Sequence, residues 1–239
     1  MAETTFELAI DASAVARRFG TRWVLRGVSM QVRAGEVVGL LGANGSGKST
    51  LLRIFGTLLR PSAGAARVYG HDVVRAADQV RGTIGFLAHT PGLYDDLTAR
   101  ENLRFAATML GIGSDGEVAR ARGEDARARV AGEDARARVA DIDAVLARVG
   151  LTHAADERVR GFSAGMERRL AVARMLLAKP RLLLLDEPYS NLDAEGIAMM
   201  SGVITEAVRQ GGAALVVLHE LAPAAGILGR TITLRDGRN

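Results

Sequence analysis

Residues 36–50 read EVVGLLGANGSGKST. After Glu36, residues 37–41 are apolar, and the segment 36–41 predicts a short strand, while residues 49–59 have helical character. Between them, Gly42–Thr50 fits the pattern G-x-x-x-x-G-K-[ST], which is typical of loops that bind phosphate groups. Glycines let backbone N–H groups wrap closely around phosphate oxygens, and the helix that follows adds the positive end of its dipole. This stretch therefore predicts a strand–loop–helix unit that binds nucleotide.

Two side chains of this loop carry specific chemistry. Lys48 supplies a mobile cation for the β- and γ-phosphates of a nucleotide, and Ser49 can bind Mg²⁺. The residues of the loop that we expect to contact the nucleotide are Gly42, Ala43, Asn44, Gly45, Ser46, Gly47, Lys48, Ser49 and Thr50.

A second apolar run, Leu182–Leu185, is followed directly by two carboxylates, Asp186 and Glu187. A continuous apolar run suits a central parallel strand that is buried on both faces. Ligands of such sheets bind beyond the carboxyl ends of the strands. We therefore expect Asp186 to hold Mg²⁺, directly or through water, and Glu187 to polarise the water that attacks the γ-phosphate.

Strands and helices alternate outward from these two motifs. Further strands are expected at residues 6–14, 23–32, 66–69, 83–87, 214–218 and 231–234. Helices are expected over most of 98–150, at 163–178 and at 194–209. This order predicts an α/β fold, with a parallel P-loop core, an antiparallel β edge and an inserted helical subdomain. Because no linker rich in Pro, Ser or Gly separates the parts, we expect one domain over 1–239, with the helical subdomain at about 90–180.

A short internal duplication lies within the predicted helical region. Residues 123–131 and 132–140 both read GEDARARVA. Nine residues are too few for a solenoid repeat. The pattern favours a lengthened, solvated helix, and a docking surface for a partner or for anionic lipid is the alternative.

Composition excludes several classes of protein. No apolar run approaches the roughly 20 residues that span a bilayer, and the absence of cysteine excludes disulfides and thiolate metal sites. Residues 1–9 lack the basic flank and apolar core of a secretory signal. The 31 Lys and Arg residues against 27 Asp and Glu leave a net charge of +4, and aromatic residues make up only 4%. Since the positive charge is scattered and stacking surface is scarce, we expect no nucleic-acid partner.

Residues 162–166, FSAGM, lie just ahead of a predicted helix. They resemble the L-S-G-G-Q signature of the ATP-binding subunits of ABC transporters. Ser163 and Gly165 match this signature, whereas Phe162, Ala164 and Met166 depart from it. The resemblance covers nearly the whole chain, because the phosphate loop, the signature and the Asp186–Glu187 pair come in the family's order.

Three further segments match the family's pattern. Phe19 stands where the family places an aromatic residue that stacks on adenine; a buried core position for this Phe is the alternative, and Trp23 is a second, less well-placed candidate. The segment Ser190–Asp193 resembles the family's D-loop, which crosses to the other subunit. His219 matches the switch histidine near the γ-phosphate.

One position points to a subfamily. Most members carry Gln at the end of the strand that enters the helical subdomain, but this chain has His89, within the sequence FLAHTPGL of residues 86–93. His followed by x-Pro-Gly resembles the ATPase subunit of the haem exporter used in cytochrome c maturation. We therefore count His89 with Glu187 and His219 among the candidate catalytic residues.

The resemblance implies that the chain hydrolyses ATP with Mg²⁺ at two composite sites in a head-to-tail homodimer. Ser163 and Gly165 of one chain would contact nucleotide held by the phosphate loop of the other. Integral membrane subunits would bind near residues 89–96, which places the chain peripherally on the cytoplasmic face of the inner (plasma) membrane.

Three alternatives stay open. The chain could serve another ABC exporter, of a drug or another small molecule. It could be a soluble ABC-type ATPase that acts on DNA or ribosomes, although the stretch between Lys48 and Ser163 is too short for a long coiled coil. It could also be a non-catalytic partner of an active paralogue.

Overall fold

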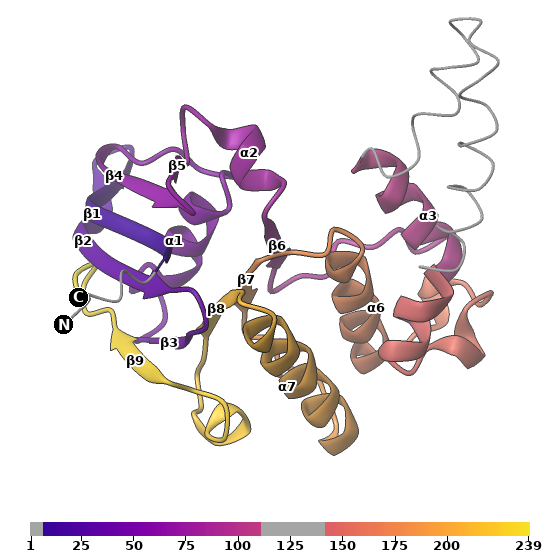
Figure 1. Ribbon diagram of the computed structural model, residues 1–239. Coiled ribbons are helices and arrows are strands. Elements are labelled where there is room, and N and C mark those ends of the chain that lie inside the picture. Colours follow the sequence, from indigo (N-terminus) through magenta and orange to yellow (C-terminus); the bar gives the residue numbers. More distant parts are fainter. Residues whose placement is uncertain (1–6, 111–141) are drawn as a thin grey trace, which may run out of the picture. The chain divides into compact units, whose positions relative to one another are not determined.

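The computed structural model describes residues 7–110 and 142–239, so the duplication at 123–140, and our prediction for it, lie outside the described residues. The chain separates into two compact units (Figure 1). The first unit comprises Met1–Thr90, Lys179–Ser190 and Ile197–Asn239, and the second comprises Pro91–Ala178 and Asn191–Gly196.

The first unit contains an antiparallel sheet with the order β2-β1-β4-β5. Its strands are β1 (Leu8–Phe19), β2 (Arg22–Arg33), β4 (Ala63–Val68) and β5 (His71–Asp72). Strands β1 and β2 form an antiparallel hairpin whose turn lies at Gly20 and Thr21. Along β2, buried residues alternate with exposed ones over Val28–Arg33, so one face of this strand packs on the core. In β1 the alternation is interrupted where the register between β1 and β2 shifts.

A second sheet of the first unit is parallel and has the order β6-β7-β8-β3-β9. Its strands are β3 (Val37–Leu41), β6 (Ile84–Leu87), β7 (Leu182–Asp186), β8 (Ala213–Val217) and β9 (Arg230–Thr233). All residues of β7 and β8 are buried, which explains their continuous apolar sequences.

Helix α1 (Lys48–Phe55) contacts strands of both sheets (Figure 1). Its apolar side chains belong to a hydrophobic core that also contains residues from both sheets. It is shorter than the predicted 49–59, because Gly56 caps it and Thr57 has a positive φ of 61°. The sequence did not predict the short helix α2 (Ala77–Arg81) or the one-turn helix η3 (Ala222–Ala224).

The second unit is built from helices and short turns. It contains α3 (Ala99–Met109), a helical stretch at 142–148, η1 (Thr152–Ala154), η2 (Val159–Gly161) and α6 (Ala164–Leu176). The first residues of α7 (Ala194–Arg209) also belong to it, and the remainder of α7 belongs to the first unit.

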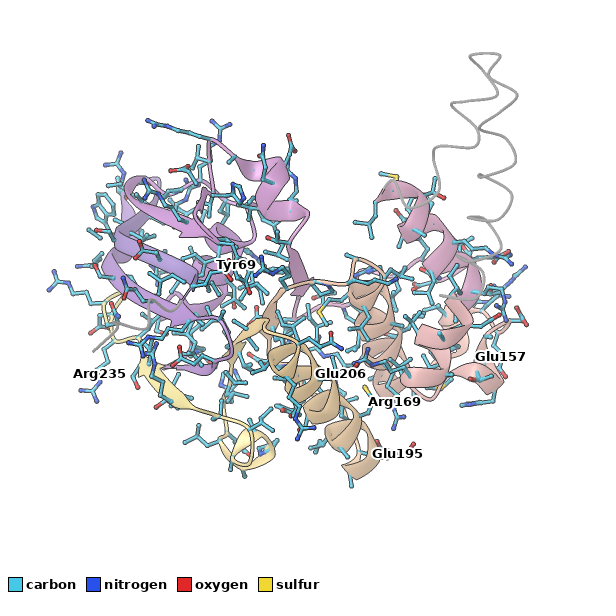
Figure 2. All side chains as sticks on the ribbon, viewed as in Figure 1. Tyr69, Glu157, Arg169, Glu195, Glu206 and Arg235 are labelled. Carbon is cyan, nitrogen blue, oxygen red and sulfur yellow. The ribbon has the colours of Figure 1, made fainter. Side chains whose placement is uncertain are left out.

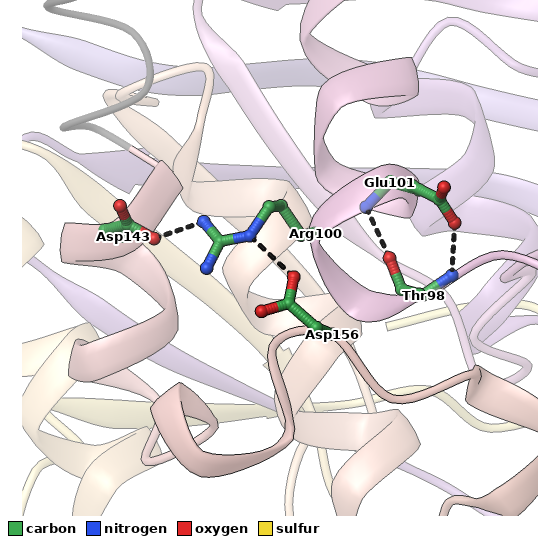
Figure 3. A network of polar contacts seen from close by, with 5 residues as sticks. All are labelled: Thr98, Arg100, Glu101, Asp143 and Asp156. Carbon is green, nitrogen blue, oxygen red and sulfur yellow. Dashed lines mark hydrogen bonds and ion pairs between the residues drawn. The ribbon is translucent and has the colours of Figure 1, made fainter.

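Helix α3 starts at a capping box, in which Thr98 Oγ1 accepts from Glu101 N–H while the Glu101 carboxylate accepts from Thr98 N–H (Figure 3). Arg100, in the first turn, pairs with Asp143 and Asp156 and so joins α3 to two later segments of this unit. These hydrogen bonds raise the pKa of Arg100 further above its usual value.

The α/β fold class is confirmed. The antiparallel strands form a complete sheet of their own, because β1 pairs with β2 on one side and with β4 on the other.

Among the described residues, no helix has the length and apolar character to cross a membrane.

Candidate active site

Four neighbouring strands of the parallel sheet end at the same edge, and the candidate residues follow them. Val217, the last residue of β8, pairs with Leu40 of β3 on one side and with Asp186 of β7 on the other. Neighbouring strands lie about 4.8 Å apart. Leu40, just before the phosphate loop, and Asp186 therefore lie roughly 10 Å apart on the two sides of β8. His219 follows β8 by two residues, and His89 follows β6. The sheet therefore gathers residues that are far apart in sequence.

The phosphate loop depends on glycines that no larger residue could replace. Gly42 and Gly47 have φ angles of 147° and 106°, which favour glycine. A Cβ at Gly42 would lie 2.5 Å from the Leu234 carbonyl oxygen, and one at Gly47 would lie 2.6 Å from the Leu25 side chain. The loop is therefore held between Leu234, just after β9, and Leu25 of β2, with no room for side chains at these two positions.

Lys48 and Ser46 give the loop polar groups that suit a polyphosphate. The Lys48 side chain is buried and its Nζ donates to the carbonyl oxygens of Gly42 and Ala43, at 2.6 and 3.0 Å. Ser46 Oγ is buried and has no hydrogen-bond partner among the residues that the structure describes. Helix α1 begins at Gly47 without a side-chain cap, so its first N–H groups also remain as donors. A triphosphate would satisfy all of these groups.

The residues proposed for Mg²⁺ also suit that ion. Asp186 ends β7 and is 3% exposed, and Ser49 lies in the first turn of α1. In the described part of the chain, no group of three or more His, Asp or Glu side chains could hold a metal by itself. Mg²⁺ commonly takes one or two protein oxygens and completes its shell with water and substrate phosphates, which is what Ser49 and Asp186 would allow.

Glu187 lies between two histidines. Its Oε1 is 2.5 Å from His219 Nε2, and its Oε2 is 3.3 Å from His89 Nδ1. The structure thus brings together all three residues that the sequence predicts as catalytic. Glu187 has a φ of 52°, an uncommon value for a residue with a side chain. Backbone strain of this kind is frequent at functional sites.

A cavity of about 250 Å³ lies beside Glu187 and is lined by Tyr189, Ser190, His219 and Glu220, among others. Burial raises the pKa of Tyr189, whose hydroxyl lies 3.1 Å from Ser201 Oγ. Tyr189 therefore stays neutral and fixes the segment that follows Glu187 to α7.

The two candidate aromatic residues flank the β1–β2 turn, and both are exposed: Phe19 by 44% and Trp23 by 40%. Exposure excludes the buried core position for Phe19. The guanidinium carbon of Arg17 lies 4.6 Å from the Phe19 ring centroid, and that of Arg18 lies 5.6 Å from the Trp23 ring. Cation–π contacts hold each ring while leaving area for a ligand.

Ser163 and Gly165 belong to the second unit, whereas the phosphate loop and the cluster of Glu187, His89 and His219 belong to the first. Ser163 is the N-cap of α6, and its Oγ accepts from Met166 N–H at 3.2 Å. A Cβ at Gly165 would lie 2.9 Å from the Asn191 carbonyl oxygen, so this position requires a small residue.

Two residues of the second unit, Asn102 and Arg169, make side-chain contacts that the sequence does not indicate. Asn102 is 3% exposed; its Oδ1 accepts from Tyr94 N–H at 2.9 Å, and its Nδ2 reaches the carbonyl oxygens of Tyr94 and Thr98 at 3.0 Å. Arg169 pairs with Asp193 at 2.9 Å. A single sequence gives no signal for either contact, because the partners lie on loops whose path only the structure reveals.

The parallel sheet, the glycine-lined phosphate loop and the carboxylates at the end of β7 define the class of protein: a P-loop nucleoside triphosphatase. The chain belongs to the ABC transporter family, whose model matches residues 25–190. Membership of this family implies that the chain is the ATPase subunit of a transporter and that it binds and hydrolyses ATP.

Relatives within the family serve different transporters. The chain is 36% identical to daunorubicin resistance ATP-binding protein DrrA3 of Streptomyces coeruleorubidus, over 97% of this chain and 67% of that protein. It is 35% identical to cytochrome c biogenesis ATP-binding export protein CcmA of Cupriavidus pinatubonensis, over 91% of this chain and 86% of that protein. A solved ATP-binding subunit of an ABC transporter shares 25% identity and superposes with a TM-score of 0.78, covering 96% of this chain and 87% of the other.

Proposed function

We propose that this chain energises the haem exporter of cytochrome c maturation by hydrolysing ATP, with Glu187 as the general base. The observation that carries the catalytic part is the Glu187 cluster, in which the carboxylate lies between His219 and His89 at the edge where the phosphate loop also lies. A carboxylate held by two imidazoles is oriented to accept a proton from water.

The other residues have distinct roles in this reaction. The phosphate loop binds the triphosphate through its backbone N–H groups, and Lys48 turns from the loop carbonyls to the β- and γ-phosphates. Ser49 and Asp186 hold Mg²⁺, which neutralises charge on the phosphates when bound. Phe19 stacks on the adenine. His219 holds Glu187 in position and reports the state of the γ-phosphate.

We propose further that two chains act as a head-to-tail homodimer. The exposed N-cap of α6 would bring Ser163 and Gly165 to the nucleotide held by the partner chain, where the helix dipole and free N–H groups favour phosphate. Residues 91–178 would act as the helical subdomain, docked beneath membrane subunits on the cytoplasmic face of the membrane.

The haem-exporter assignment rests on His89 with Pro91 and Gly92, and the similarity to a cytochrome c biogenesis export protein supports it. The test is complementation of a bacterium that lacks its own haem-exporter ATPase. Expression of this chain with its membrane subunits should restore haem-stained c-type cytochromes, and the Glu187→Gln variant should not. Failure to restore them, with the complex shown to assemble, would contradict the assignment.

A drug exporter is the second candidate, because the similarity to a daunorubicin resistance protein extends over 97% of the chain. The same strains distinguish the two functions. A drug exporter would raise the inhibitory concentration of an anthracycline in a manner that depends on Glu187, and it would leave the cytochromes unrestored.

A further inference from the structure

The Arg17 side chain lies against the ring of Phe19, two residues further along β1. Its guanidinium carbon is 4.6 Å from the ring centroid, and its Nη1 donates to the Arg60 carbonyl oxygen at 2.9 Å. Its Nε is buried and has no hydrogen-bond partner within residues 7–110 and 142–239. The Arg60 carbonyl and the Phe19 ring therefore set the place of the guanidinium. Because Phe19 is 44% exposed, its ring keeps open area beyond this contact.

Strand register places the two candidate aromatic residues on opposite faces of the β1–β2 hairpin. Arg17 pairs with Leu25, Arg18 pairs with Trp23, and the register shifts between the two pairs. Successive residues of a strand point to opposite faces, and residues paired across an antiparallel ladder share a face. Phe19, two residues from Arg17, therefore shares the face of Leu25, whereas Trp23 shares the opposite face with Arg18. The two cation–π contacts agree with this division.

The face that carries Leu25 is the one that meets the phosphate loop. A Cβ at Gly47 would lie 2.6 Å from the Leu25 side chain, so loop and strand are in close contact there. Gly47 directly precedes Lys48 and the start of α1. Phe19 and Arg17 therefore lie on the loop side of the hairpin.

A cavity of about 550 Å³ lies beside the same loop. It is lined by Arg22, by residues 42–46 of the phosphate loop and by Arg235, among others. Arg22 pairs with Phe19 across the hairpin turn. Figure 2 shows Arg235 on the segment that follows β9. A nucleotide whose phosphates occupy the loop would thus extend its base toward Phe19 rather than Trp23.

We infer that Arg17 is a positioning residue for the base of ATP, because it holds the Phe19 ring from one face and leaves the other face for the adenine. This inference rests on the proposed stacking role of Phe19. An exposed ring at a hairpin turn loses rotamer freedom when a ligand orders it, and a ring that is held beforehand avoids much of this loss. Arginine suits the task, since its planar guanidinium stacks on an aromatic face while an N–H bonds a carbonyl.

The experiment is the equilibrium binding of ATP to the full chain, measured by dialysis without Mg²⁺ so that hydrolysis does not intervene. Arg17→Gln should raise the dissociation constant about threefold to fivefold, as expected for a partly exposed cation–π contact. Arg17→Lys should recover part of the affinity, since an ammonium keeps the charge but does not stack as a plane. With Mg²⁺ present, the KM for ATP should rise by a similar factor while kcat stays unchanged, which a loss of folded protein would not produce.

Three comparisons separate a role at the base from general damage. Inorganic tripolyphosphate has no base, so its competition with ATP for the phosphate loop should reflect an unchanged tripolyphosphate affinity in Arg17→Gln. Arg18→Gln is the matched control: it removes the neighbouring arginine and its contact with Trp23, and it should leave ATP affinity unchanged. Phe19→Ala should weaken ATP binding about tenfold, and adding Arg17→Gln to it should cause no further loss. If Arg17→Gln does not fold, Arg17→Met keeps the apolar stem of the side chain without the charge.

The outcomes also separate this inference from the proposed function. Wild-type ATP affinity in Arg17→Gln, with weakened binding in Phe19→Ala, would overturn the inference and leave the stacking role of Phe19 intact. Equal losses of affinity for ATP and for tripolyphosphate would overturn it too, because Arg17 would then support the loop and not the ring. Wild-type affinity in Phe19→Ala would overturn the proposed role of Phe19 and this inference with it.

Discussion

The edge of the parallel sheet and the signature region of the second unit position their functional residues in different ways. At the sheet edge, strand register fixes the residues: Val217 lies beside both Leu40 and Asp186, and its neighbours are fully buried. In the signature region, the N-cap hydroxyl of Ser163 and the ion pair of Arg169 with the exposed Asp193 carboxylate fix the residues instead. The first arrangement is stiff because main-chain ladders and core packing define it. The second depends on a few polar contacts that water and salt can weaken, which suits the surface that we propose to meet a partner chain.

The largest expected effect is on the rate of ATP hydrolysis and concerns the edge of the parallel sheet. Glu187→Gln keeps the size of the side chain and its contacts but removes the base, so hydrolysis should slow by ~10²–10⁴-fold. ATP binding should persist, because the phosphate loop is untouched. Turnover and ATP affinity measured on the same preparation check this, with Glu206→Gln on α7 as a control at a distance from the cluster. Unchanged turnover would remove Glu187 from the mechanism.

The second prediction concerns the stability of the second unit. Asn102→Ala leaves the Tyr94 N–H without its partner, and an unsatisfied group of this kind costs roughly 1–3 kcal/mol. It also removes the bonds from Asn102 Nδ2 to the carbonyls of Tyr94 and Thr98, although both carbonyls keep a backbone N–H partner. We expect a loss of about 2 kcal/mol or more in the free energy of unfolding, measured by urea denaturation. Thr98→Ala removes only the cap of α3 and should cost about 1 kcal/mol. An Asn102→Ala protein as stable as wild type would mean that this hydrogen-bond network contributes nothing.

His89 provides a test of coupling between the sheet edge and membrane subunits. His89→Ala should leave nucleotide affinity within a few-fold and lose most of the stimulation of ATPase activity by those subunits. His89→Gln should retain more of it, because Gln shares part of the hydrogen-bonding capacity of imidazole. The comparison is turnover of the isolated chain against that of the reconstituted complex. Equal stimulation in all three proteins would limit His89 to a marker of the subfamily.

The smallest effect is a pH dependence in the second unit. The hydrogen bond from Gly196 N–H, followed by that from Arg169, lowers the pKa of Asp193 from 3.8. A lowered pKa means that Asp193 contributes stability above about pH 4, and that this contribution is lost as the pH falls through the folded-state value. Asp193→Asn should therefore be less stable than wild type at pH 6, and the difference should shrink below pH 4. A difference that is constant with pH would exclude an ionised contact.

Sequence alone predicted the sheet edge better than the signature region. Apolar runs identify β3, β7 and β8, and the rule that ligands bind at the carboxyl ends of parallel strands brings Lys48, Asp186, Glu187 and His219 to one edge. The contact between His89 and Glu187 follows from the pairing of β6 with β7, which no local pattern reveals. The register of α6 against the Asn191–Asp193 loop depends on long side chains with many rotamers, so the Arg169 contacts could not be predicted. The exposure of Phe19 also required the structure, because β1 runs on to Phe19, beyond the predicted strand at 6–14, and a Phe at the end of a strand suits the core or the surface.

The central claim is that the sheet edge of one chain and the signature region of another form one hydrolytic site, and mixing two inactive variants tests it most directly. Lys48→Ala disables the phosphate loop, and Ser163→Arg blocks the signature loop, so each homodimer should be inactive. A mixture forms heterodimers with one intact site of two, and random pairing should restore up to about a quarter of the wild-type rate. No recovery of ATP hydrolysis, with heterodimers demonstrated by differential tags, would contradict the composite site.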